Sequence, residues 1–243
     1  MNEKMEVKAL HREHNKVKAV YLAFLAAIIP GAVIMYRTSS AMVSYVVIAS
    51  LIVAYFFILM PMRERLECNV QGAFLHNTLG GTLSGIHYDP DGGITDAEFA
   101  QSGFVRKAEL GYVTCYKRIT GVQEKDTVDI GVLEYGIKKD KQQTAVKAVY
   151  IHLHDDEKND APIIVTDKNT ILPEDEKRKE LLIRIRELSG GNYSLRIEGS
   201  DAYMLLPDRD LLVKTPLFKD FNETELITDR LPELAVLGEL FKA

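Results

Sequence analysis

Two long apolar runs near the N-terminus constrain the fold of this chain more than any other feature of its sequence. Residues 19–35 and 41–62 contain no charged side chain, and only residues 36–40 separate them. A helix needs about 20 apolar residues to cross roughly 30 Å of hydrocarbon. The second run reaches that length by itself, and the first reaches it with its polar flanks. The sequence therefore predicts two transmembrane helices, residues 19–36 and 41–62, in a lipid bilayer rather than a buried pair in a soluble core.

Basic residues predict the orientation of this helical pair. Residues 1–18 contain five Lys or Arg and residues 63–65 contain two, whereas the loop between the runs holds only Arg37. Cytoplasmic flanks of membrane helices carry an excess of Lys and Arg. We therefore expect a multi-pass protein of the cell inner (cytoplasmic) membrane with both termini in the cytoplasm. Because the second run follows directly, we expect residues 1–18 to be a retained basic segment rather than part of a cleaved signal peptide.

The charge pattern excludes two function classes. Residues 63–243 carry 24 basic and 32 acidic side chains, so this soluble part is a poor candidate for nucleic-acid binding, which relies on neutralised phosphates. Neither apolar run holds an ionisable residue. A proton relay or ion path inside the membrane would need such residues, which argues against a channel or transporter formed by this chain alone.

Hydrophobic periodicity predicts an α+β domain with a mainly antiparallel sheet in residues 63–243. Helices are expected at residues 63–78, after a Thr95–Glu98 capping box, and at 173–188 and 231–241. Alternating runs predict strands at 112–119, 126–136, 144–154 and 162–166, with a charged loop at 155–160. A hairpin is expected with strands 193–197 and 202–206 and a turn at 198–201.

Two phrases and their setting resemble a known group of membrane proteins. The phrases are Ile86-His87-Tyr88-Asp89-Pro90-Asp91-Gly92-Gly93-Ile94 and Glu98-Phe99-Ala100-Gln101-Ser102-Gly103-Phe104, with further likeness at Tyr203–Leu206 and Thr215–Phe218. Together with the two apolar runs, they resemble a bacterial two-span membrane protein family of unknown function, often found beside LemA-type proteins. The resemblance implies the architecture and a LemA-like helical partner. It implies no catalytic residues.

His152 and His154 are the candidate metal ligands of the sequence. Two residues apart on a strand, both imidazoles point to one face, and Asp156 continues that row. A zinc site needs further ligands, which His87 or Asp89 could supply. The alternative is a solvent-facing strand edge that ends in an acidic loop.

Other chemical motifs are weaker. Residues 80–85 lack the Lys-Ser/Thr ending of a phosphate-binding loop, and residues 89–93 fit a tight turn better than a calcium loop. The two cysteines, Cys68 and Cys115, are too few and too far apart for a disulfide framework. We expect Cys115 to be a packing residue, because no His neighbours it in sequence.

Two functions from different classes follow. The first is a membrane-anchored, non-enzymatic scaffold or assembly subunit that forms homo-oligomers or binds a LemA-like partner, with no cofactor. The second is a membrane-anchored metal-dependent hydrolase or ligand sensor that uses the His152–His154 strand. Since no catalytic signature motif occurs, the sequence favours the non-enzyme.

Overall fold

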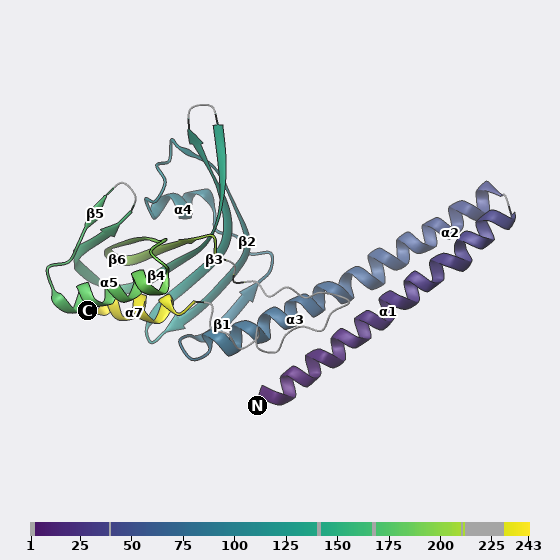
Figure 1. Ribbon diagram of the computed structural model, residues 1–243, viewed down its shortest axis with the longest axis horizontal. Helices are drawn as coiled ribbons and strands as arrows, with labels where there is room; N and C mark the ends of the chain where they lie inside the picture. The colour runs from purple at the N-terminus through teal and green to yellow at the C-terminus, as the bar shows by residue number, and fades with distance from the viewer. Residues whose placement is uncertain (1–2, 39, 140–141, 167–168, 210, 212–230) are drawn as a thin grey trace. The chain divides into compact units, whose positions relative to one another are not determined.

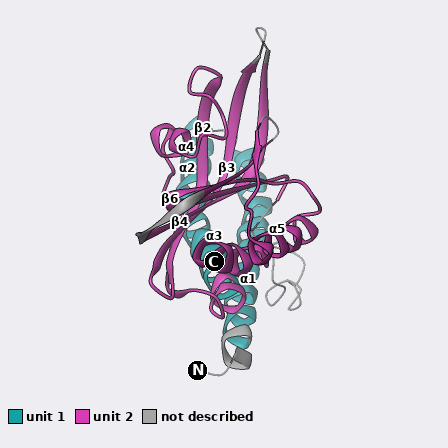
Figure 2. Cartoon of the chain, turned by 90° about the vertical axis from the view of Figure 1, so that its left-hand side faces the viewer, with its two compact units in different colours: residues 1–74, 213–228 teal, residues 75–212, 229–243 magenta. Residues whose placement is uncertain are grey.

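Figure 1 shows the computed structural model of the chain. It describes all residues except 1–2, 39, 140–141, 167–168, 210 and 212–230. The chain forms two compact units, a helical unit of residues 1–74 with 213–228 and a sheet unit of residues 75–212 with 229–243 (Figure 2). The fold contains both long helices and an antiparallel sheet, so the predicted α+β class is confirmed.

The helical unit contains two long helical stretches. α1 (Glu3–Thr38) joins the basic segment and the first apolar run, with Pro30 inside it. α2 (Ala41–Ala54), the π-helical turn η1 (Tyr55–Leu59) and α3 (Met60–Leu79) follow one another without a break. Both stretches are long and apolar enough to cross a membrane, and only 6% of each apolar window is buried. Such exposure suits contact with lipid, whereas the core helix of a soluble protein would be mostly buried.

α1 and α2 approach closely at a glycine. A Cβ atom placed on Gly31 would lie 3.1 Å from Cγ1 of Val47, which is tighter than an ordinary van der Waals contact. Small residues allow helix backbones to come together in this way. Nearer the start of α1, Glu13 accepts hydrogen bonds from Nδ2 of Asn69 in α3, at 2.9 and 3.1 Å. The two helical stretches are therefore joined at both apolar and polar positions.

The sheet unit contains six strands among the described residues, and all of them pair antiparallel. They are β1 (Ser84–Asp89), β2 (Leu110–Gln123), β3 (Asp126–Lys139), β4 (Gln142–Val165), β5 (Thr170–Ile171) and β6 (Ser194–Pro207). The order is β1-β2-β3-β4-β5, and β6 pairs with β4 as well. The three central predicted strands are confirmed, and β4 is the strand around which the sheet is organised.

Two local predictions were wrong because β4 and β6 are longer than the sequence suggested. The predicted charged loop 155–160 lies inside β4, and the predicted hairpin 193–206 is the single strand β6. β6 pairs with β4 on both sides of residues 198–201, and Gly199 within this stretch pairs with Asn159, so long-range pairing keeps the expected turn in a strand. The register shifts near Gly199, whose φ of 63° suits glycine, and a bulge there absorbs the extra residues.

Cross-strand neighbours in a sheet share a face. We call the face that holds Tyr150 and His152 the α4 face, because α4 (Asp96–Gln101) packs against it. The ring centroid of Phe99 lies 5.0 Å from that of Tyr135 and 5.7 Å from that of Tyr150. The predicted capping box at the start of α4 is present, and Asp96 in its first turn accepts a hydrogen bond from the amide of Val113 in β2 at 2.9 Å, which ties this short helix to the sheet.

The opposite face of the sheet is contacted by α7 (Glu233–Lys242) at β4, and α5 (Glu176–Leu188) packs against α7 (Figure 1). These helices confirm the predictions at 173–188 and 231–241. The side chains of Ile151, Leu153 and Met204 on this face are completely buried. Both faces of the sheet therefore bury apolar side chains, and the α4 face also carries polar side chains along part of its length.

Candidate functional site

The two predicted histidines lie on β4 with their side chains on the α4 face. Their cross-strand partners on β6 are Tyr203, opposite His152, and Asp201, opposite His154. The ring of His152 stacks on that of Tyr203, with centroids 4.5 Å apart and an interplanar angle of 14°. Stacking on the buried Tyr203 restricts how the His152 ring can turn.

Both imidazoles converge on one carboxylate oxygen. Nε2 of His152 lies 2.7 Å from Oδ1 of Asp201, and Nδ1 of His154 lies 2.9 Å from the same oxygen. Because an ionised carboxylate only accepts hydrogen bonds, each of these nitrogens carries a proton in this arrangement. His152, His154 and Asp201 therefore form a compact triad of ligand atoms, all within 4.8 Å of one another.

The environment of Asp201 favours its charged form. Partial burial alone would raise the pKa of this carboxyl, but the hydrogen bonds from His152 and His154 outweigh it and hold the pKa below its ordinary value of 3.8. A carboxylate that is ionised at neutral pH is what a cation site requires. The triad therefore brings together two imidazole nitrogens and one negatively charged oxygen.

The histidine pair opens into a polar cleft of about 520 Å³ on the α4 face. Its other polar lining residues include Glu98 of α4, Arg118 of β2 and Asp129 of β3. Nε of Arg118 donates to Asp129 at 3.0 Å, and Nη1 donates to the carbonyl oxygen of Gly93 at 3.0 Å. We call this cavity the polar cleft. Its charges are paired with one another, so it is a preorganised polar surface beside the triad.

A bulge in β2 brings Arg118 to this cleft. The register of β2 against β3 shifts between Cys115 and Lys117, so Cys115 and Arg118 both face α4 although three positions separate them. Sγ of Cys115 lies 3.3 Å from the carbonyl oxygen of Lys117, and burial raises the pKa of this thiol. A thiol with a raised pKa is a weak nucleophile, which agrees with the packing role expected for Cys115.

The structure does not bring the other predicted ligands to the histidines. His87 and Asp89 lie on β1, and His87 is aligned with His152 only through Thr120 of β2 and Asp129 of β3. Three strand spacings amount to about 14 Å, which is too far for a shared ion. The suggestion that β1 completes the site was therefore wrong. The side chain of Asp156 lies outside the described side chains.

Asp201 is the candidate ligand that the sequence pattern did not indicate. The sequence placed it in a turn between two strands, where its carboxylate would have no fixed relation to β4. As a residue of β6 it faces His154 across the ladder instead. The alternation of polar and apolar residues after Gly199 could have indicated that the strand continues. The pairing with β4, however, joins Asp201 to His154, 47 residues earlier in the chain.

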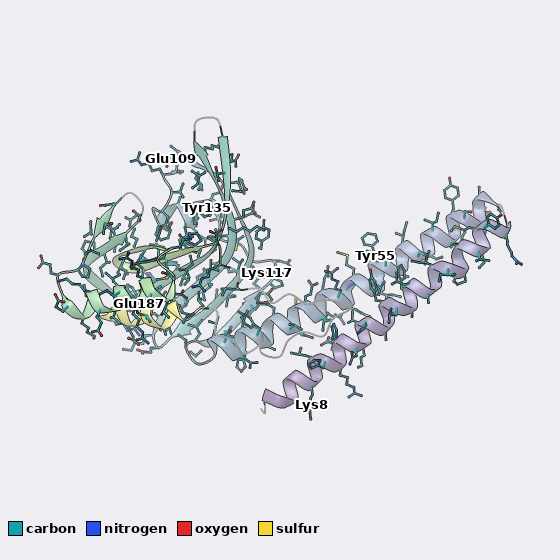
Figure 3. The ribbon with its side chains drawn as sticks, viewed as in Figure 1. Lys8, Tyr55, Glu109, Lys117, Tyr135 and Glu187 are labelled. Atoms are coloured by element: carbon teal, nitrogen blue, oxygen red, sulfur yellow. The ribbon has the colours of Figure 1, made fainter. Side chains whose placement is uncertain are left out.

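A second cavity, of about 830 Å³, lies between the α4 face and the β5–α5 segment. Its apolar walls include Tyr135 and Leu205 of the sheet and Leu182 of α5, and Glu109 lies at its rim. Glu109 and Tyr135 are both labelled in Figure 3. We call this cavity the apolar cleft. Its size falls within the range of roughly 300–1,000 Å³ that is usual for small-molecule sites.

No family model, no curated protein and no solved structure matches the chain. The function must therefore be inferred from the two clefts themselves.

Proposed function

We propose that this protein is a membrane-anchored, metal-binding sensor or hydrolase whose ion is held by His152, His154 and Asp201. The observation that carries the proposal is the convergence of two imidazole nitrogens on one carboxylate oxygen, at 2.7 and 2.9 Å. Two imidazoles and a carboxylate are a ligand set that Zn²⁺ accepts, with metal–ligand distances of about 2.0–2.2 Å.

The partial exposure of the triad favours a functional rather than a structural ion. The side chains of His152, His154 and Asp201 are 28%, 44% and 30% exposed. Structural zinc sites are closed by four protein ligands, whereas a site with three protein ligands keeps a position for water or a ligand. A bound ion would face the polar cleft, where it could polarise a ligand or activate a water molecule.

Metal binding would replace two hydrogen bonds. The proton on Nε2 of His152 and the proton on Nδ1 of His154 would each move through solvent to the other nitrogen of the same ring, so that each ring stays neutral and presents a lone pair to the ion. Stacking on Tyr203 would hold the His152 ring during this exchange. Since ligand atoms of one tetrahedral ion are about 3.3 Å apart, the triad would need to open only slightly.

The test is the metal content of the full chain purified in mild detergent without chelators. We expect about one equivalent of Zn²⁺ per chain, and its loss in the His152→Ala/His154→Ala double variant. His87→Ala is the matched control, because His87 is also on the sheet but belongs to β1. Metal-free protein that gains no ion from added Zn²⁺, or equal metal content in the double variant and the control, would contradict the proposal.

The position in the cell is part of the same proposal. Two candidate membrane-spanning helices and the distribution of basic residues support an inner-membrane protein with both termini in the cytoplasm. In a Cys68→Ser/Cys115→Ser background, a membrane-impermeant maleimide applied to intact cells should label Arg37→Cys in the last turn of α1. It should label Lys8→Cys only after lysis, and the reverse pattern would overturn this orientation.

Self-association and binding of a LemA-like helical partner stay predictions of the sequence. Both would appear in the mass of the particle extracted in mild detergent, with its chains identified by mass spectrometry. A large homogeneous assembly would support the scaffold function, and a lone 27.3 kDa chain would contradict it.

A further inference from the structure

Several apolar side chains that line the apolar cleft are exposed to solvent. Leu172, next to β5, is 59% exposed and Ile183 of α5 is 58% exposed, and both line the cavity. Ile171, at 40%, is the only other large aliphatic side chain of the sheet unit that is exposed among the described residues. Exposed aliphatic groups gathered at one cavity are typical of a binding site for an apolar molecule.

The inner walls continue this apolar surface. Tyr135, Ile137 and Leu205 line the cavity from the α4 face, and Leu182 lines it from α5. A hydrocarbon chain in this space would remove apolar surface from water on both partners, at about 25 cal/mol per Å². The cleft is therefore suited to a ligand with a long apolar part.

A cation lies at the same cavity. Arg186 of α5 lines the cleft one turn beyond Ile183 and is exposed. Its guanidinium makes no ion pair with any side chain in the part of the chain that the structure describes. The other cation of the lining, Lys179, is already paired with Glu176 at 2.7 Å. An arginine in this position can bind a carboxylate through two parallel hydrogen bonds.

We propose that the apolar cleft binds a long-chain fatty acid, with the acyl chain between the sheet and α5 and the carboxylate at Arg186. The polar residues at the rim, such as Asn192 and Ser194, would face the headgroup end and its water. This site lies apart from the metal triad and does not depend on it. The lining sets of the two clefts have no residue in common.

The experiment is photolabelling of the full chain in nanodiscs with palmitic acid that carries a diazirine on its acyl chain. We expect saturable labelling that maps to peptides of β5, α5 and the segment before β6. The Leu172→Glu/Ile183→Glu variant should lose this labelling, because two carboxylates at the opening repel the ligand and remove apolar contact. Ile171→Glu is the matched control, since Ile171 is exposed on the same segment but does not line the cavity.

A second pair of variants tests the headgroup. Arg186→Gln should raise the concentration for half-saturation about tenfold, as expected for loss of one charge-assisted contact. Arg184→Gln, an exposed neighbour outside the cavity, should leave it unchanged. The alcohol of the same chain length should compete about tenfold less well than palmitate. All four variants change exposed residues, so an unchanged thermal unfolding transition verifies their folding.

The possible outcomes separate clearly. Labelling confined to peptides of α1 and α2, or equal labelling in Leu172→Glu/Ile183→Glu and Ile171→Glu, would overturn the proposal. Labelling that is lost in that double variant but unaffected by Arg186→Gln would overturn the carboxylate and indicate a neutral lipid. Since metal content is measured separately, failure here would leave the proposed metal site untouched.

Discussion

The polar cleft and the apolar cleft belong to the same face of one sheet but differ in what builds them. The polar cleft depends on rows of cross-strand neighbours, such as Asp129 beside His152. The apolar cleft depends on α5 lying beside the sheet near β5, with Leu182 and Ile183 of α5 in its wall. The polar cleft is therefore specified by the register of the strands, and the apolar cleft by the position of α5 relative to the sheet.

Phe99 of α4 connects these two regions. It is completely buried, and its ring packs against Tyr135, which lines the apolar cleft, and against Tyr150, which lines the polar cleft. A single aromatic side chain thus supports one wall of each cavity. The difference between the clefts can be tested by asking which changes affect both and which affect only one.

The largest effect is expected from Phe99→Ala. Removing a fully buried aromatic ring leaves a cavity and should cost about 3–5 kcal/mol of unfolding free energy. Because the ring touches both walls, metal binding and fatty-acid binding should weaken together. Thermal unfolding of the full chain in detergent, followed with both binding measurements, checks this. Phe99→Leu, which keeps most of the volume, should lose clearly less stability, and equal losses would argue against a cavity effect.

A smaller and more selective effect is expected from Asp201→Asn. The amide keeps the shape of the side chain but removes the negative charge on which both histidines converge. Loss of an outer-shell partner typically costs about 10–100-fold in metal affinity, so loss of a ligand should cost at least tenfold. Zinc titration of the full chain measures it, with Asp91→Asn in the turn before α4 as the control.

Fatty-acid labelling should be unchanged in Asp201→Asn, since this residue does not line the apolar cleft. A parallel loss at both clefts would mean that the substitution disturbs the sheet as a whole. That result would remove the distinction between a site set by register and a site set by helix packing.

The sequence predicted well those elements whose signals are local. In the capping box, the amide of Glu98 donates to Oγ1 of Thr95 at 3.2 Å and the amide of Thr95 donates to Oε2 of Glu98 at 2.6 Å. The helix predicted at 173–188 begins after Asp175, whose carboxylate accepts a hydrogen bond from the amide of Arg178. Capping and helical periodicity involve residues three or four apart, so a single sequence contains them in full.

Long-range pairing was what the sequence could not show. Gly199 with its polar neighbours has the composition of a turn, and only pairing with β4 keeps that stretch in a strand. The lack of long-range information also explains why only part of the candidate site was predicted. The histidines were found from their spacing on one strand, but Asp201 joins them through a contact between distant segments, which no local pattern contains. The apolar cleft was missed for the same reason, because its walls come from separate elements.

The smallest effect concerns the polar cleft alone and depends on pH. The hydrogen bond from the Thr95 amide is the main reason why the pKa of Glu98 lies below its ordinary value of 4.5, although partial burial opposes the shift. The contribution of the ionised carboxylate to stability is therefore present above the unfolded pKa and is lost as pH falls through the lower folded pKa. At pH 7, Glu98→Gln should cost about 0.5 kcal/mol or less, because the amide can still accept the capping hydrogen bond and the side chain is 43% exposed.

Unfolding curves of the full chain and of Glu98→Gln between pH 7 and pH 3 measure this contribution. The gap between them should be constant down to about pH 4.5 and should close below it. Glu187→Gln, an exposed glutamate of α5 outside any capping box, is the control. A gap that widens as the pH falls would mean that folding raises the pKa of Glu98, so that α4 would not be held to the sheet by an ionised capping residue.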